Sequence, residues 1–218
     1  MDLSEVITIL NQTLRGWASY FRRGVSKRTF GQIDEHAWWG LVGWIRAKHS
    51  RISLKAIDLS ASYAKAVREA LPDAVLVADR FHLVHLANDM LTQVRQRVTR
   101  ESQGRRVLKN DPAWASRRRL LTAHERLRPE AFARMWNSLI DTGDPGVQLL
   151  QAYAVKEELR SPLALAGTHP ERHRIRTRLD SFYRHAAAAD APEAHRLAAT
   201  IETWWPAIEA GILTGYSN

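Results

Sequence analysis

The sequence contains no cysteine in 218 residues, which excludes disulfides and thiolate metal ligands. It also lacks an apolar run near the roughly 18 residues that a membrane-spanning helix requires. The first twenty residues show no basic start followed by an unbroken apolar stretch, so no secretory signal is visible. We therefore expect a cytoplasmic protein with no membrane partner.

Acidic residues are fewer than basic residues. Lys and Arg number 32 against 23 Asp and Glu, which gives a formal net charge of +9. The excess is uneven, because residues 95–134 hold twelve basic and four acidic side chains, whereas residues 198–218 hold no Lys or Arg. Such a concentration of positive charge predicts a polyanion as partner.

Residues 54–100 show a strand–helix–strand–helix pattern. Two short apolar runs, 54–57 and 74–78, are typical of buried strands, and helical periodicity follows each. Asp58 and Asp79 come directly after the two strands. The carboxyl edge of an α/β sheet is a common ligand site. The alternative is that both aspartates are ordinary helix caps or turn residues.

The rest of this region is helical in pattern. A polar loop is expected at 101–115 and helices at 117–127, 129–140, 147–159, 173–189 and 194–210. Asp144-Pro145-Gly146 is expected to break the chain between two helices, and Pro206 to kink or end the last one. Arg117, Arg118 and Arg119 predict contact with DNA phosphates; the alternative is a solvated helix face.

The first 49 residues predict an αα-hairpin of helices at about 4–24 and 26–49. Its connection carries Arg22, Arg23, Lys27 and Arg28 beside aromatic residues, a composition that suits a nucleic-acid backbone and stacked bases. The alternative is a solvated connector beside an aromatic core.

Two motifs in the central region carry a resemblance. D-L-S-x-x-Y contains Asp58, Ser60 and Tyr63, and D-R-F-H runs from Asp79 to His82. Together with LLTAHERLRPE and LQAYAVKEELR further on, they resemble the bacterial insertion-sequence transposases of the ISL type, over about residues 53–218. The resemblance implies a DDE domain with an RNase H-like fold.

In that family three carboxylates hold two Mg²⁺ ions that cut and join DNA. By resemblance Asp58 is the second of these acids and a metal ligand. Ser60, Tyr63, Asp79 and His82 would support the motif, with His82 positioning a phosphate or a metal-bound water. No residue matches the first acid, and the sequence stops where the third segment begins. We therefore expect no stable Mg²⁺ binding and no catalysis.

The first 49 residues carry a second resemblance. The patterns L-N-x-x-L-R-G-W-x-x-Y-F, S-K-R-T-F-x-x-I-D and W-W-x-L-V-x-W-I-R-x-K-H, which lie between residues 10 and 49, are similar to the maturase-specific domain of group II intron proteins. That domain helps to bind and fold intron RNA, which implies RNA as a partner of this segment.

The expected fold is therefore mostly α with a small α/β part. It consists of a maturase-like hairpin (1–49), a junction (50–53) and an incomplete RNase H-like domain (54–218), with its strands in 54–100 and helices in 101–218. The expected function is that of a truncated, inactive, transposase-related chimera that binds DNA at transposon ends. The alternatives are a non-catalytic basic RNA- or DNA-binding protein, or an oligomer subunit completed by a partner's acids.

Overall fold

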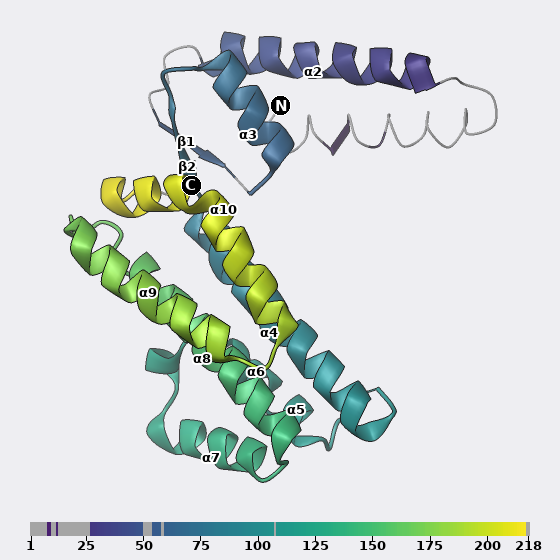
Figure 1. Ribbon diagram of the computed structural model, residues 1–218, viewed down its shortest axis with the longest axis vertical. Coiled ribbons are helices and arrows are strands. Elements are labelled where there is room, and N and C mark those ends of the chain that lie inside the picture. Colours follow the sequence, from purple (N-terminus) through teal and green to yellow (C-terminus); the bar gives the residue numbers. More distant parts are fainter. Residues whose placement is uncertain are drawn as a thin grey trace. The chain divides into compact units, whose positions relative to one another are not determined.

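The computed structural model describes residues 8, 9, 12, 27–49, 54–57, 59–106 and 108–216 (Figure 1). These residues are mostly helical, which confirms the predicted class, and they include one two-stranded sheet. The chain divides into two compact units: Met1–Ser53 with Ser60–Ala74, and Leu54–Leu59 with Val75–Asn218. The domain limits expected from the sequence remain a prediction. No helix in the described part of the chain is long and apolar enough to span a bilayer.

The first unit packs α2 (Lys27–His49) against α3 (Ala61–Ala70). Ile45 of α2 is fully buried, whereas Trp39, which lies off the apolar stripe, is 58% exposed. The Trp38 indole N–H donates to Glu69 Oε2 at 2.8 Å and so links the two helices. Of the first helix expected in the hairpin, only residues 8, 9 and 12 lie within the described residues.

The second unit contains the sheet. Strands β1 (Leu54–Ile57) and β2 (Val75–Ala78) are parallel, and Ile57 lies opposite Ala78 at their carboxyl ends. Both strands occur where the apolar runs predict them. Val77 and Ala78 are buried, and the last helix of the chain packs against β2.

The helical part of this unit is built around two long helices that pack together, α4 and α8; α9 packs on α8, and α10 on α4 (Figure 1). The helices are α4 (Arg80–Gln103), α5 (Pro112–Ala115), α6 (Arg117–Leu121), α7 (Pro129–Ile140), α8 (Asp144–Leu163), α9 (Arg172–Ala188) and α10 (Pro192–Thr214), with a 3₁₀ turn η1 (His124–Arg126). Leu83, Leu91, Leu149 and Phe182 are fully buried in their common core. Each such side chain contributes roughly 1.5–3 kcal/mol through removal from water.

One expectation about helix limits is wrong. The Asp144-Pro145-Gly146 segment belongs to α8, because proline fits the first turn of a helix, where no backbone donor is needed. Gly146 is required there, since a Cβ would lie 1.8 Å from the Leu139 carbonyl oxygen. Pro206 lies inside α10, which continues to Thr214, so the helix does not end at this proline and the expected kink stays a prediction.

The segment between α4 and α7 also differs from the prediction. The expected loop at 101–115 contains the end of α4 and the short helix α5. The expected helix at 117–127 is interrupted, because α6 ends at Leu121 and Thr122 adopts an extended conformation. At the interruption, Lys156 of α8 donates hydrogen bonds to the carbonyls of Leu120 and Thr122.

Candidate functional site

The carboxyl edge of the sheet carries the D-R-F-H motif. Asp79 follows β2 and is the N-cap of α4, with extended backbone angles and a carboxylate that accepts a hydrogen bond from the Phe81 N–H at 3.3 Å. The capping role that composition suggested for this aspartate is therefore present. An N-cap of this kind stabilises a helix by about 1 kcal/mol.

The D-L-S-x-x-Y motif is only partly described. Asp58, the residue expected to bind metal, lies outside the described residues, as does the side chain of Tyr63. Ser60 directly precedes α3, and its carbonyl accepts a hydrogen bond from the Ala64 N–H at 2.8 Å. Their expected roles as motif residues stay predictions.

Histidines follow the sheet edge on α4. His82 is half-buried, and His85 Nδ1 lies 3.0 Å from Asp89 Oδ2 on the exposed side of the helix. Among the residues that the structure describes, no three His, Cys, Asp or Glu side chains are grouped so that they could hold a metal ion.

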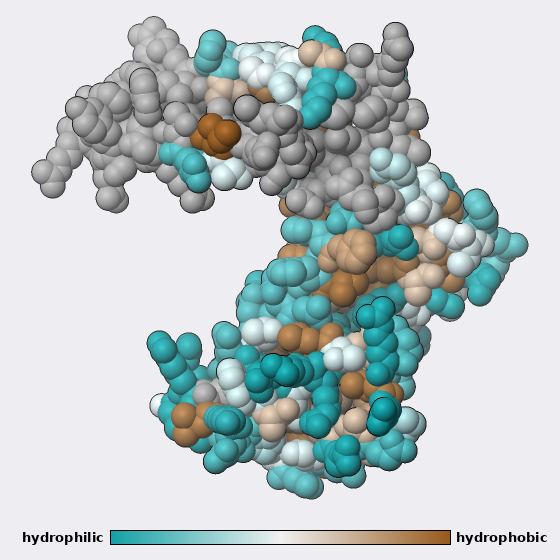
Figure 2. Space-filling model, turned by 180° about the vertical axis from the view of Figure 1, so that it is seen from behind, coloured by the Kyte–Doolittle hydropathy of each residue, from teal (hydrophilic) through white to brown (hydrophobic). Residues whose placement is uncertain are grey.

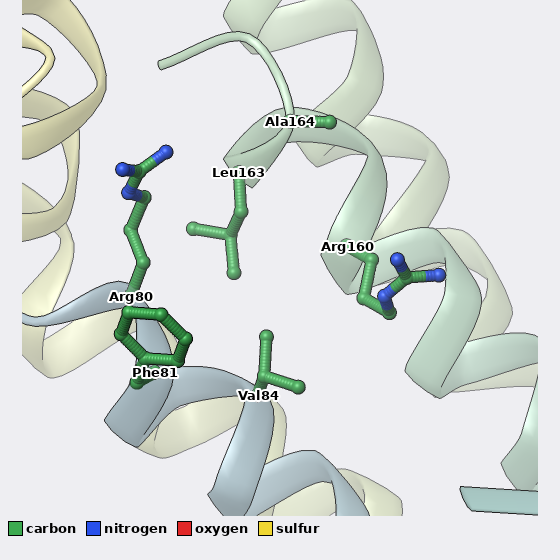
Figure 3. Close-up of a pocket in the computed structure, with 6 residues that line it drawn as sticks. All are labelled: Arg80, Phe81, Val84, Arg160, Leu163 and Ala164. Atoms are coloured by element: carbon green, nitrogen blue, oxygen red, sulfur yellow. The ribbon is translucent and has the colours of Figure 1, made fainter. Parts of the chain in front are cut away.

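A pocket of about 250 Å³ lies beside the D-R-F-H turn, between α4 and α8 (Figure 3). Phe81 is 74% exposed at this position, and Val84 and Leu163 supply further apolar lining. The Arg160 guanidinium points away from Phe81 in Figure 3, because it is bonded elsewhere. Arg80 is the second cation of the pocket, and its buried Nε has no hydrogen-bond partner in the described part.

The three adjacent arginines differ in environment. Arg117 is held internally: its Nη1 donates to the Trp114 carbonyl at 2.9 Å and its guanidinium lies 4.2 Å from the centre of the Trp114 ring. Arg118 is exposed and Arg119 is half-buried, and neither forms an ion pair with another described residue. Only these two are available for an external phosphate.

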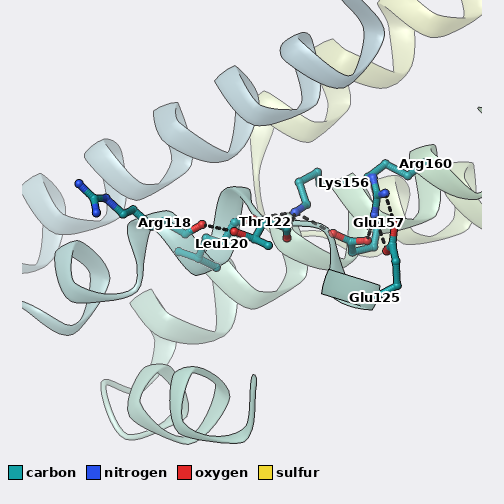
Figure 4. A network of polar contacts seen from close by, with 7 residues as sticks. All are labelled: Arg118, Leu120, Thr122, Glu125, Lys156, Glu157 and Arg160. Atoms are coloured by element: carbon teal, nitrogen blue, oxygen red, sulfur yellow. Dashed lines mark hydrogen bonds and ion pairs between the residues drawn. The ribbon is translucent and has the colours of Figure 1, made fainter. Parts of the chain in front are cut away.

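The segment that carries these arginines is fixed to α8 by a buried lysine (Figure 4). Lys156 is 1% exposed, and its Nζ donates to the carbonyls of Leu120 at 2.7 Å and Thr122 at 2.9 Å. It also lies 2.7 Å from Glu157 Oε1, as an ion pair outside hydrogen-bond geometry. Burial lowers the Lys156 pKa, and the neighbouring Glu157 opposes that shift.

A second contact joins the same segments. Arg160 donates to both carboxylate oxygens of Glu125, on η1, and to Glu157 (Figure 4). The hydrogen bond from Arg160 is the main cause that lowers the pKa of Glu125 to about 2. Glu157 and the neighbouring Glu158 are both half-buried. Lys156 was missed, although a lysine between Tyr153 and Leu159 on an apolar helix face was a visible signal.

Of the residues expected to contact nucleic acid in the first 49, the structure describes only some. Arg22 and Arg23 lie outside the described residues. Lys27 and Arg28 form the first turn of α2, and their side chains also lie outside the description. Further along α2, Lys48 Nζ lies 4.7 Å from the centre of the Trp44 ring.

Comparison with known protein families places the chain. Residues 42–218 match the transposase family of the DDE type and ISL3 group, and the chain belongs to this family. Residues 1–60 match the maturase-specific domain of group II introns. Both resemblances expected from the sequence are confirmed, although the transposase match begins before residue 53 and overlaps the maturase match. No curated protein and no solved structure matches the chain.

Proposed function

We propose that this chain is a transposition-related protein whose helical part binds the DNA backbone. Membership of the transposase family supports a role connected with transposition. The short parallel strands β1 and β2, each followed in sequence by a helix, support assignment of this region to an RNase H-like domain with a helical insertion. The partner in this proposal is DNA at transposon ends, with the sequence of those ends undefined.

The observation that carries the proposal is the uncompensated charge of residues 95–134. Part of the charge is neutralised internally, since Arg97 pairs with Glu193 and Glu101, and Arg105 pairs with Asp111. Apart from Arg117, which Trp114 holds, the cations in this range that are exposed or half-buried and form no ion pair with a described residue are Arg100, Arg106, Lys109, Arg118, Arg119, Arg126, Arg128 and Arg134. Hydrophilic residues cover much of the face of this helical part that Figure 2 presents. Such a surface suits sequence-independent contact with phosphates.

We further propose that these 218 residues do not cut or join DNA by themselves. The parent family normally uses a divalent metal held by three acids, and Asp58 alone matches one of those acids. One carboxylate is too few ligands for a two-metal centre. If another copy of the chain supplied the missing acids, plasmid incubated with the protein and MgCl₂ would be cut.

A second candidate function is RNA binding through the maturase-like segment. The match of residues 1–60 to the maturase-specific domain favours it, as does the 58% exposed Trp39 on α2, a helix that also carries Arg46 and Lys48. Exposed aromatic side chains beside cations can stack on unpaired bases. In this proposal residues 1–49 bind RNA, residues 50–53 are a junction, and residues 54–218 bind DNA.

Fluorescence anisotropy with a labelled duplex, at a series of KCl concentrations, tests the DNA proposal. The double variant R118Q/R119Q is expected to bind roughly tenfold more weakly, and the slope of log affinity against log salt should fall by about 0.9 for each phosphate that the variant no longer neutralises. The matched control is R174Q/R176Q, which removes from α9 two exposed cations that form no ion pair with a described residue. Equal reductions in affinity for both variants would show that binding does not depend on the segment 95–134.

A further inference from the structure

A buried arginine in the helical part forms no ion pair with any residue that the structure describes. Arg95, on α4, is 8% exposed, and its Nη1 has no hydrogen-bond partner in the described part of the chain. Burial lowers the Arg95 pKa, and the charge of Arg117 lowers it further. Because an arginine stays protonated even so, the protein holds a partly desolvated charge that no described carboxylate compensates.

The acidic groups near this site in sequence are already engaged. Asp111 accepts two hydrogen bonds from Arg105, each of 2.9 Å, and one from the Leu108 N–H. Glu101 pairs with Arg97 at 2.9 Å. Neither carboxylate pairs with Arg95, and no ion pair joins Arg95 to another described residue.

Arg95 lines a cavity of about 350 Å³ together with Gln96, Arg100, Arg106 and Trp114. Three of these five residues are cations, and none is acidic. Arg100 and Arg106 are exposed at this cavity, whereas Arg95 is its buried residue. The volume is sufficient for a phosphate group with part of the sugar that carries it.

Local structure places these cations around the cavity. Gly104 ends α4 in the left-handed conformation, at φ +65°, and its N–H donates to the Arg100 carbonyl at 2.9 Å. This reversal turns the chain back, and the Arg105–Asp111 pair holds the next segment. Arg106 is thereby brought to the same cavity as Arg100.

Trp114 fixes the orientation of the arginine side chains. The Arg95 guanidinium lies 5.5 Å from the centre of its ring and that of Arg117 lies 4.2 Å from it. Cation–π attraction of about 0.5–2 kcal/mol for each contact holds two like charges near one another. The arrangement is pre-organised for an anion, since its donors need little reordering on binding.

We propose that the Arg95 cavity binds one phosphodiester group of a nucleic-acid strand, with Arg95, Arg100 and Arg106 as its cationic donors and Gln96 as a neutral one. The choice of a strand phosphate rests on the proposed DNA-binding function. The cavity adds to that function a defined place where the backbone is held, distinct from the diffuse contacts of Arg118 and Arg119.

The test compares the full-length protein with Arg95→Met, which keeps the length of the side chain and removes its charge. Relief of the desolvated charge and of its repulsion by Arg117 should offset the lost contact with Trp114, so the melting temperature should change little. At the same time duplex affinity should fall roughly tenfold, with a salt slope smaller by about 0.9. Arg176→Met, on α9, is the control for removal of one exposed unpaired cation and should change neither quantity.

A thermal-shift series with inorganic phosphate and a duplex oligonucleotide separates the two proposals. Greater stabilisation of the wild type than of Arg95→Met by the duplex supports the phosphodiester site. Stabilisation by inorganic phosphate alone, without duplex binding, would contradict both the strand as ligand and the DNA-binding function. Duplex binding that is unchanged in Arg95→Met would overturn the cavity proposal and leave DNA binding intact. A large drop in the melting temperature of Arg95→Met with unchanged affinity would show a structural arginine instead.

Discussion

The guanidinium of Arg117 lies 4.2 Å from the centre of the Trp114 ring, and its Nη1 donates to the carbonyl of the same residue at 2.9 Å. The first arginine of the R-R-R run is therefore part of the folded structure. Its neighbour Arg118 is exposed and forms no ion pair with a described residue. Three identical side chains in a row thus divide between a structural role and an available surface.

Arg117→Gln is expected to lower the free energy of unfolding by about 1–2 kcal/mol, because it removes one hydrogen bond and one cation–π contact. Arg118→Gln is the matched control and should change stability by no more than about 0.5 kcal/mol. Urea denaturation followed by circular dichroism measures both. Equal effects of the two substitutions would show that the Trp114 contact contributes nothing to stability.

Lys156→Met should destabilise the protein by about 3 kcal/mol, since it leaves the carbonyls of Leu120 and Thr122 without their donor and removes one of the two cations that pair with Glu157. Lys109→Met, at an exposed lysine with no ion pair to a described residue, is the control and should have little effect. Hydrogen exchange adds a local measurement. The amides of residues 120–122 should lose protection in Lys156→Met, and retained protection there would mean that the lysine does not fix this segment to α8.

The Glu125–Arg160 pair predicts a specific acid dependence. The Glu125 pKa is lowered from 4.5 to about 2, mainly by the hydrogen bond from Arg160. Between these values the unfolded chain binds a proton that the folded chain does not. The stabilisation is therefore complete above pH 4.5 and is lost as the pH falls to about 2. Because Glu125 is largely exposed, its size should be at most about 1 kcal/mol.

A double-mutant cycle with Glu125→Gln and Arg160→Gln, measured by urea denaturation, checks this dependence. The two side chains should stabilise each other at pH 6, and their coupling energy should approach zero near pH 2. A coupling energy that is independent of pH over this range would contradict an ionic contact between the two side chains.

The sequence predicted those strands and helices whose position depends on neighbouring residues alone. The strands at 54–57 and 75–78 and the helix at 129–140 occur where apolar periodicity places them. The proline of Asp144-Pro145-Gly146 predicts a break, but proline also fits the first turn of a helix, and neighbouring residues alone do not distinguish the two. The two family resemblances could be recognised because their motifs are also short, local stretches of the sequence.

The features that were not predicted depend on contacts between distant residues. Lys156 binds carbonyls 34 and 36 residues away, and the Arg95 cavity requires α4, the Gly104 turn and α5 to meet. Charge counting identified the basic region 95–134 but could not separate paired from unpaired cations. The expected role of Asp58 remains a prediction, because this residue lies outside the described part of the chain.

The central claim is that this transposase-family chain holds DNA through its basic helical part and does not cut it. Electrophoresis of supercoiled plasmid incubated with the protein and MgCl₂ at low salt tests both halves of the claim. The expected result is retarded plasmid that is recovered fully supercoiled after the protein is removed. Nicked or joined products that disappear with the Asp58→Asn variant, or an absence of retardation, would contradict the account.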